Sequence, residues 1–192
     1  TTITQLVDTA GKLSQNRRGA LIVVDLGSDL RPEDFLYSGT KIEAQLSTDL
    51  LINLFATDTP LHDGAVLVKG NKIISAGVIL PLSRQGISRY GTRHLAALGI
   101  TERFDRCICI VVSEETGTLS LANQGKLERP ITSSRLQELL VNLIGNQNSI
   151  GTNKSSLGKN SLSQNTNLSD NIVDDSKGKE TEKPAIFINK NN

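Results

Sequence analysis

The chain's only two histidines lie in two short polar segments, each next to an apolar stretch. The first segment, residues 61–65, has the sequence LHDGA, and its His62 and Asp63 offer one nitrogen and one carboxylate oxygen to a divalent cation. Gly64 has no side chain, so a ligand can approach the backbone closely. The same residues also suit a plain turn that leads into a strand, with Asp63 bonding its own backbone. Both interpretations stay open on these residues alone.

The second segment, residues 91–94, has the sequence GTRH and begins a predicted helix. Backbone N–H groups at a helix start, here around Thr92, attract anions. Arg93 adds a planar guanidinium that suits phosphate oxygens. The alternative is an ordinary capped helix with a solvated Arg93, followed by His94.

A third polar segment, residues 113–117, follows an apolar run and has the sequence SEETG. Glu114 and Glu115, at the carboxyl end of a strand, can bind a metal ion or a ribose, or they can form a charged turn. No segment is specific alone. Together they predict a phosphate-binding domain or one that catalyses metal-assisted phosphoryl transfer.

Helices and strands that alternate along the chain would position these segments. Apolar spacing predicts helices over 3–16, 47–55, 92–98 and 132–144, with a helical turn over 32–37. Apolar runs predict strands over 20–24, 65–69, 72–80, 107–112 and 119–122. Gly70 and Asn71 suit a two-residue hairpin turn, which requires an antiparallel pair. This pattern predicts an α/β (α+β) domain with a central mixed sheet flanked by helices.

The composition changes after Ile144. Residues 145–192 contain ten Asn, many Ser and Lys, and few apolar residues. Such a segment buries too little apolar surface to offset the entropy lost on ordering. We therefore predict one domain over residues 1–144 and a disordered low-complexity tail over residues 145–192.

Charge and composition argue against several classes of protein. The 21 Lys and Arg nearly balance the 20 Asp and Glu, aromatic residues make up 3% and there is no Trp, so we expect no nucleic-acid partner. Cys107 and Cys109 alternate on one predicted strand, so we expect two reduced, packed thiols in a reducing compartment. No apolar run approaches the roughly 18 residues of a membrane helix and no signal peptide opens the chain, so we expect the given chain to be soluble.

Five segments, in order and at fitting spacings, resemble the bacterial diadenylate cyclase domain, and within it the membrane-anchored CdaA type. They are LHDGAV at 61–66, LPLS at 80–83, GTRH at 91–94, AALGI at 96–100 and VSEETG at 112–117. The resemblance covers about residues 3–144. It implies a nucleotidyltransferase that condenses two ATP molecules into the bacterial second messenger cyclic di-AMP and releases two pyrophosphates. It also implies a cytoplasmic catalytic domain that an upstream segment anchors to the cell membrane.

The resemblance implies roles for the matching residues. Asp63 would bind Mn²⁺ or Mg²⁺ and help to activate the ribose 3′-hydroxyl, with His62 and Glu115 as further metal ligands. Arg93 and His94 would be catalytic with Asp63, because they would hold the triphosphate. The residues that would contact the nucleotide are Gly64, Ala65, Leu80, Thr92, Arg93, Ser113 and Glu114.

One nucleotide site per chain and a product with two nucleotides imply a face-to-face homodimer. Two residues depart from the family's pattern. Leu95 stands where the Arg-His-Arg motif ends in Arg, and Ile79 stands where an aromatic residue often lies beside the adenine. The Leu95 departure supports an alternative, a non-catalytic nucleotide-binding or interaction domain that kept the fold. A metal-dependent phosphohydrolase is a third hypothesis, and its products would distinguish it.

Overall fold

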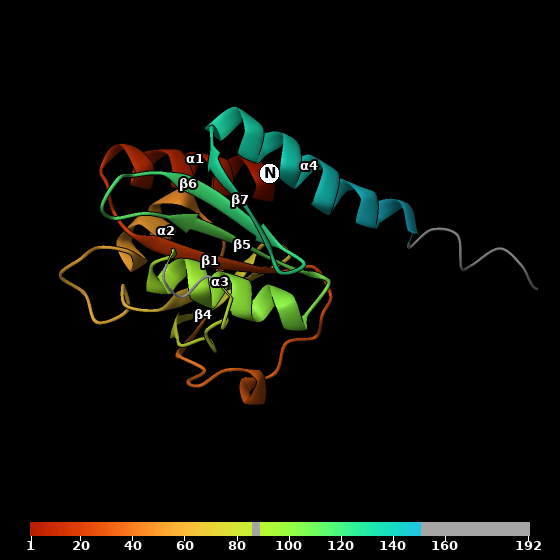
Figure 1. The fold of residues 1–192 in the computed structure, drawn as a ribbon, viewed down its shortest axis with the longest axis horizontal. Coiled ribbons are helices and arrows are strands. Elements are labelled where there is room, and N and C mark those ends of the chain that lie inside the picture. The colour runs from red at the N-terminus through yellow and green to blue at the C-terminus, as the bar shows by residue number, and fades with distance from the viewer. Residues whose placement is uncertain (86–88, 151–192) are drawn as a thin grey trace, which may run out of the picture. The chain divides into compact units, whose positions relative to one another are not determined.

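A seven-stranded mixed sheet forms the centre of the computed structural model, which describes residues 1–85 and 89–150 (Figure 1). The strands lie in the order β2-β4-β3-β1-β5-β6-β7. Their bounds are Ala20–Asp25 (β1), Thr40–Gln45 (β2), Ala65–Lys69 (β3), Lys72–Val78 (β4), Cys107–Val112 (β5), Leu119–Asn123 (β6) and Lys126–Ile131 (β7). Strands β1 and β3 are parallel, and the other neighbouring pairs are antiparallel. The predicted α/β class with a mixed sheet is confirmed.

Helices cover both faces of this sheet. The helices are α1 (Thr2–Gln15), α2 (Thr48–Leu54), α3 (Thr92–Arg103) and α4 (Ser133–Ile150), with a 3-10 turn η1 at Pro32–Asp34. Buried residues of α1, α2 and α4 share one apolar cluster with Ile22 and Val24 of β1, whereas α3 shares the other with Leu21 and Val23. Successive strand residues point to opposite faces, so α3 lies across the sheet from α1 and α4 (Figure 1).

The expected helix starts and the hairpin agree with the structure. The Ser47 side chain accepts a hydrogen bond from the backbone N–H of Leu50 and caps α2, and Thr132 does the same for Arg135 at α4. Strands β3 and β4 pair on either side of Gly70, which has φ 61°.

Both cysteines are free and buried on the α3 face of β5, as predicted. Burial raises the pKa of the Cys109 thiol well above its usual range, so this thiol stays protonated inside the core.

The sequence predicted that this helix ends at Gly99, but α3 continues to Arg103. Gly99 lies in the interior of the helix, and the loop after β4 packs directly against it. A Cβ atom at Gly99 would lie 2.2 Å from the backbone oxygen of Pro81 and 2.8 Å from the backbone nitrogen of Ser83. The glycine therefore serves close packing rather than helix termination.

Two further boundaries and two strands differ from the expectation. Strand β4 ends at Val78 rather than at residue 80, and α4 continues past Ile144 to Ile150. Strands β2 and β7 were not predicted, because both are edge strands whose residues are largely exposed and include few apolar side chains. Of the predicted tail, residues 151–192 lie outside the described residues. None of the helices described here is both long enough and apolar enough to cross a membrane.

Candidate active site

The three polar segments meet at one edge of the sheet because of the strand directions. The parallel strands β1 and β3 begin at this edge, while β4 and β5, antiparallel to them, end there. The register pairs Ala20 with Val112 and Ala65 with Val78. Three segments are therefore neighbours in space, next to the start of α3: residues 62–64 before β3, residues 79–82 after β4 and residues 113–116 after β5.

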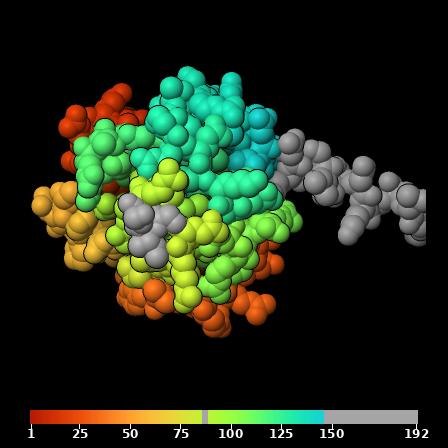
Figure 2. Space-filling view, viewed as in Figure 1, coloured from red at the N-terminus to blue at the C-terminus, as the bar shows by residue number. Residues whose placement is uncertain are grey.

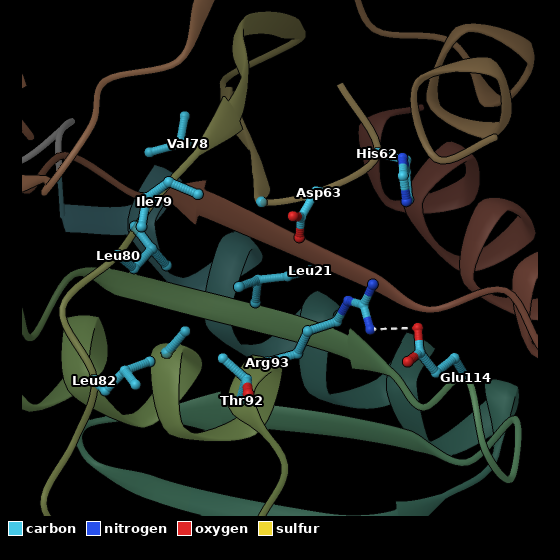
Figure 3. A pocket seen from close by; sticks show the side chains of 12 residues that line it. Leu21, His62, Asp63, Val78, Ile79, Leu80, Leu82, Thr92, Arg93 and Glu114 are labelled. Carbon is cyan, nitrogen blue, oxygen red and sulfur yellow. Dashed lines mark hydrogen bonds and ion pairs between the residues drawn. The ribbon is translucent and has the colours of Figure 1, made fainter. Parts of the chain in front are cut away.

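A cleft of about 430 Å³ opens among these segments (Figure 3). This volume falls within the roughly 300–1,000 Å³ that is usual for small-molecule sites. One part of its wall is apolar and the other carries charged groups. The lining residues are Leu21, His62, Asp63, Gly64, Val78, Ile79, Leu80, Leu82, Thr92, Arg93, Ala96 and Glu114.

Asp63 extends toward the cleft from the turn before β3 (Figure 3). Among the described residues, no hydrogen bond or ion pair engages its carboxylate. The plain-turn interpretation, in which Asp63 bonds its own backbone, therefore has no support in this part of the chain. Gly64, with φ 118°, lets the turn pack on β4, because a Cβ atom there would lie 2.9 Å from the backbone oxygen of Val78.

His62 is oriented by the backbone of the preceding turn. Its Nδ1 lies 2.5 Å from the carbonyl oxygen of Thr59, which can only accept a hydrogen bond. Nδ1 therefore carries the proton, and the lone pair of Nε2 is left for a metal or a proton donor.

The predicted metal ligands are only partly assembled. His62 and Asp63 line the cleft, whereas Glu115 lines an adjacent cavity, and residues 1–85 and 89–150 contain no cluster of three or more His, Cys, Asp or Glu side chains that could hold a metal ion. One free carboxylate and one imidazole nitrogen fit a cation that takes its remaining ligands from phosphate oxygens and water, as Mg²⁺ commonly does.

Arg93 and Glu114 form an ion pair at the boundary of the cleft. The Nη1 atom of Arg93 donates to Oε2 of Glu114 at 2.7 Å, and the two side chains are 26% and 62% exposed (Figure 3). Both residues also line the adjacent cavity, whose volume is about 360 Å³. The ion pair therefore lies where the two spaces meet.

The adjacent cavity is polar and surrounds the start of α3. Helix α3 begins after Gly91, which has no side chain to accept from the N–H groups of the first turn. Those N–H groups, together with the arginines of the wall, favour an anion. The lining residues are Arg89, Gly91, Thr92, Arg93, His94, Val112, Ser113, Glu114, Glu115, Thr116 and Arg129.

His94 is a buried side chain held between elements. Its Nε2 lies 3.1 Å from Oγ of Ser120 on β6, and its ring stacks on Tyr90 with centroids 6.3 Å apart. Burial, then the positive charges of Arg129 and Arg93, lowers the pKa of His94, which favours a neutral ring at neutral pH. The imidazole therefore joins α3 to β6, and its contact with a triphosphate stays a prediction.

The two cavities together contain all but one of the residues predicted for nucleotide binding. The exception is Ala65, which is fully buried in the core and lines neither cavity. The sequence also left several lining residues unidentified. Leu21 and Val78 have the pattern of ordinary core residues, and Arg89 and Arg129 become neighbours only through the fold.

Comparison with known proteins gives a consistent result. Residues 7–127 match the family model described as DisA bacterial checkpoint controller nucleotide-binding. The chain is 47% identical over 131 residues to a diadenylate cyclase of Listeria monocytogenes, covering 67% of this chain and 47% of that protein. It is 41% identical over 141 residues to the cyclic di-AMP synthase CdaA of Bacillus subtilis, covering 72% of this chain and 50% of that protein. A diadenylate cyclase of Mycoplasma genitalium is 35% identical over 145 residues, which cover 74% of this chain and 71% of that protein.

The solved structures that resemble this fold include DacA from Staphylococcus aureus, in a double-mutant form. It superimposes with a TM-score of 0.68 at 36% identity, covering 74% of this chain and 95% of that one. A hypothetical membrane spanning protein from Bacillus cereus matches with a TM-score of 0.62 at 41% identity, covering 67% of this chain and 63% of that one. The chain spans about half the length of the Listeria and Bacillus subtilis relatives.

Proposed function

The chain belongs to the bacterial diadenylate cyclase family, and from this premise we propose that it condenses two ATP molecules into cyclic di-AMP and releases two pyrophosphates. The observation that carries the proposal is the pair of cavities that share Thr92, Arg93 and Glu114. One cavity is partly apolar and suits a nucleoside. The other is polar, with three arginines and two glutamates in its wall beside the open N–H groups of α3, and suits a polyphosphate that brings a cation with it.

ATP would span the shared boundary. Its adenosine would contact Leu21, Val78 and Leu80, and its α-phosphate would lie beside Arg93. Since Arg93 is already paired with Glu114, binding would exchange a carboxylate partner for a phosphate partner. The charge of Arg93 would then stabilise the developing negative charge during transfer.

The family requires a divalent cation, and we propose Mn²⁺ or Mg²⁺ held by Asp63 and His62 together with the triphosphate. When bound, the cation would lower the pKa of the ribose 3′-hydroxyl and screen the phosphates. Glu115 lines the polar cavity rather than the cleft, and its role as a further ligand of the cation belongs to the same proposal. The protein's share of catalysis is mainly to position the reacting groups.

Catalysis also requires two chains, because each ATP must be both nucleophile and electrophile. We propose that two clefts face each other across a two-fold axis. Ile79 and Leu82 support this arrangement, since both line the cleft and are still 39% and 51% exposed. A facing chain would cover this apolar rim. Anchoring of the full-length protein to the cell membrane by an upstream segment is part of the same proposal.

Incubation with ATP and Mn²⁺ or Mg²⁺, followed by mass analysis, tests the proposal directly. We expect cyclic di-AMP and pyrophosphate, with specific activity that rises with protein concentration until the dimer saturates. An ATP analogue without the 3′-hydroxyl should bind but not react. Release of phosphate or ADP would instead indicate a phosphohydrolase. ATP binding with no product, reversed by Leu95→Arg, would indicate a non-catalytic domain.

A further inference from the structure

Arg129 lines the polar cavity although it belongs to the edge strand β7 and to none of the three polar segments. We propose that Arg129 binds the β- and γ-phosphates of ATP, the part that leaves as pyrophosphate, and that Tyr90 positions its guanidinium. This inference rests on the proposed function. It adds a substrate-binding residue that the polar segments do not contain.

A β-bulge explains why an edge residue reaches the cavity. Leu121 pairs with Glu128 and Leu119 pairs with Ile131, so two steps along β6 correspond to three steps along β7. The extra residue falls at positions 129–130. A bulge bends its strand and redirects the side chain at that point. Arg129 therefore lies on the cavity wall, beside the start of α3.

Tyr90 holds the Arg129 guanidinium at the start of α3. The Cζ atom of Arg129 lies 5.6 Å from the centroid of the Tyr90 ring, within the range of a cation–π contact. Tyr90 also stacks on His94, whose Nε2 lies 3.1 Å from Oγ of Ser120. The β6–β7 hairpin is thus connected to α3 through Arg129, Tyr90, His94 and Ser120. Figure 2 shows the green and teal hairpin beside the yellow-green α3 region.

The charge of Arg129 is not neutralised by a carboxylate in the described part of the chain. Arg93 pairs with Glu114, but none of the ion pairs formed among residues 1–85 and 89–150 includes Arg129. Arg129 and His94 both line this cavity, and the positive charge of Arg129, after burial, contributes to lowering the pKa of His94. A cation in a polar cavity, next to open helix N–H groups, is suited to a polyanion.

The position of Arg129 matches the part of ATP that leaves. In the transfer, the bond from the ribose 3′-oxygen to the α-phosphorus forms, and the 3′-hydroxyl proton passes to solvent. The bond from the α-phosphorus to the bridging oxygen breaks, and its electron pair goes to pyrophosphate. Arg93 lines both cavities, whereas Arg129 lines only the polar one, so Arg129 would receive the growing charge of the leaving group.

The test compares ligands with and without the β- and γ-phosphates. The probes are 3′-deoxy-ATP, measured by calorimetry with Mg²⁺, and 3′-deoxy-AMP, measured by competition against 3′-deoxy-ATP. We expect Arg129→Gln to weaken 3′-deoxy-ATP binding by about tenfold or more and to leave 3′-deoxy-AMP within about twofold. Arg129→Lys, which keeps the charge without the planar group, should give an intermediate loss.

Arg103→Gln is the matched control. Arg103 also lies over an aromatic ring, that of Phe104 at 5.7 Å, but it is near the other end of α3 and lines neither cavity. We expect it to change neither affinity. Melting temperatures of all variants show whether the fold is kept.

Two results would overturn the inference. An equal loss for both ligands would mean that Arg129 only positions α3, and an unchanged affinity for 3′-deoxy-ATP would mean that it does not contact the phosphates. The proposed function can fail separately. If Arg129→Gln lost affinity only for 3′-deoxy-ATP, but the wild-type protein made no cyclic di-AMP, the binding role of Arg129 would stand and the cyclase activity would be rejected.

Discussion

Gly19 lies against Arg93, and a Cβ atom at position 19 would be only 2.6 Å from Arg93 Nη1. The same atom would lie 2.9 Å from Oε2 of Glu114, the partner of Arg93. The ion pair at the boundary of the two cavities therefore occupies the space of the missing side chain. Gly19 directly precedes β1, so the start of a core strand determines where the Arg93 guanidinium can lie.

The first prediction is that Gly19→Ala impairs the site but not the fold. The atoms in its way are the ends of flexible side chains, so Arg93 and Glu114 can move at little cost to stability. We expect a nearly unchanged melting temperature and a loss of about tenfold in ATP affinity, because one charge-assisted contact is misplaced. Gly11→Ala in α1, where the nearest atom is Ser133 Oγ at 3.5 Å, should leave affinity unchanged. Normal ATP affinity in Gly19→Ala would contradict the proposed role of Arg93.

The second prediction concerns Gly99, where the expected effect is on stability. Alanine is the better helix former by about 1 kcal/mol, yet its Cβ atom would overlap backbone atoms of Pro81 and Ser83 that cannot move freely. We expect Gly99→Ala to lower the free energy of unfolding by about 1–3 kcal/mol, as measured by urea denaturation. The loop that carries Leu80 and Leu82 should also shift and weaken ATP binding.

A stabilised Gly99→Ala protein would show that the loop after β4 can retreat from α3. The hydrogen bond from the Ser83 backbone nitrogen to the Leu95 carbonyl oxygen, 2.9 Å long, reports on this directly. Faster amide exchange at Ser83 is the expected companion of the destabilisation.

The same glycine shows what the sequence could and could not predict. Local pattern correctly predicted the core strands β1, β3 and β5, because continuous apolar runs have few other structures open to them. It misplaced the end of α3 because a glycine that ends a helix and a glycine that admits a neighbouring loop look alike. Only the position of Pro81 distinguishes the two cases.

The candidate site also contains residues that the sequence could predict and residues that it could not. His62, Asp63, Arg93 and Glu114 were predicted because polar residues next to apolar strands, and a family resemblance, point to them. Arg129 was not, because β7 is an exposed edge strand without an apolar pattern, and its bulge depends on pairing with β6. Residues brought together by register alone leave no signal in the local sequence.

The third prediction follows from the lowered pKa of His94. The unfolded chain has the ordinary value of about 6.5, so on acidification it binds a proton more readily than the folded protein does. Stability from this residue is complete above pH 6.5 and falls as the pH drops toward the lower folded-state pKa. We expect wild-type protein to lose more unfolding free energy than His94→Gln between about pH 7.5 and about pH 5.5, by at most about 1.4 kcal/mol per pH unit.

Glutamine at position 94 can still bond to Ser120 Oγ but cannot take up a proton. The two proteins are compared by urea denaturation at each pH. Equal losses in both would mean that the pKa of His94 is the same in the folded and unfolded states. If the wild-type protein instead lost unfolding free energy relative to His94→Gln as the pH rose above 6.5, the pKa of His94 would be raised rather than lowered in the folded state.

The final prediction is that Asp63→Asn abolishes cyclic di-AMP synthesis while the fold is retained. The carboxylate has no hydrogen bond or ion pair among the described residues, so its removal breaks no structural contact there. It does remove the charge that would hold the cation, and metal assistance contributes several kcal/mol, so we expect a loss of about 100-fold or more. Asp58→Asn, the same change at an exposed position five residues earlier, is the control and should retain activity. Mass analysis of product and a melting curve measure both effects, and near-normal synthesis by a folded Asp63→Asn protein would rule out Asp63 as the metal ligand.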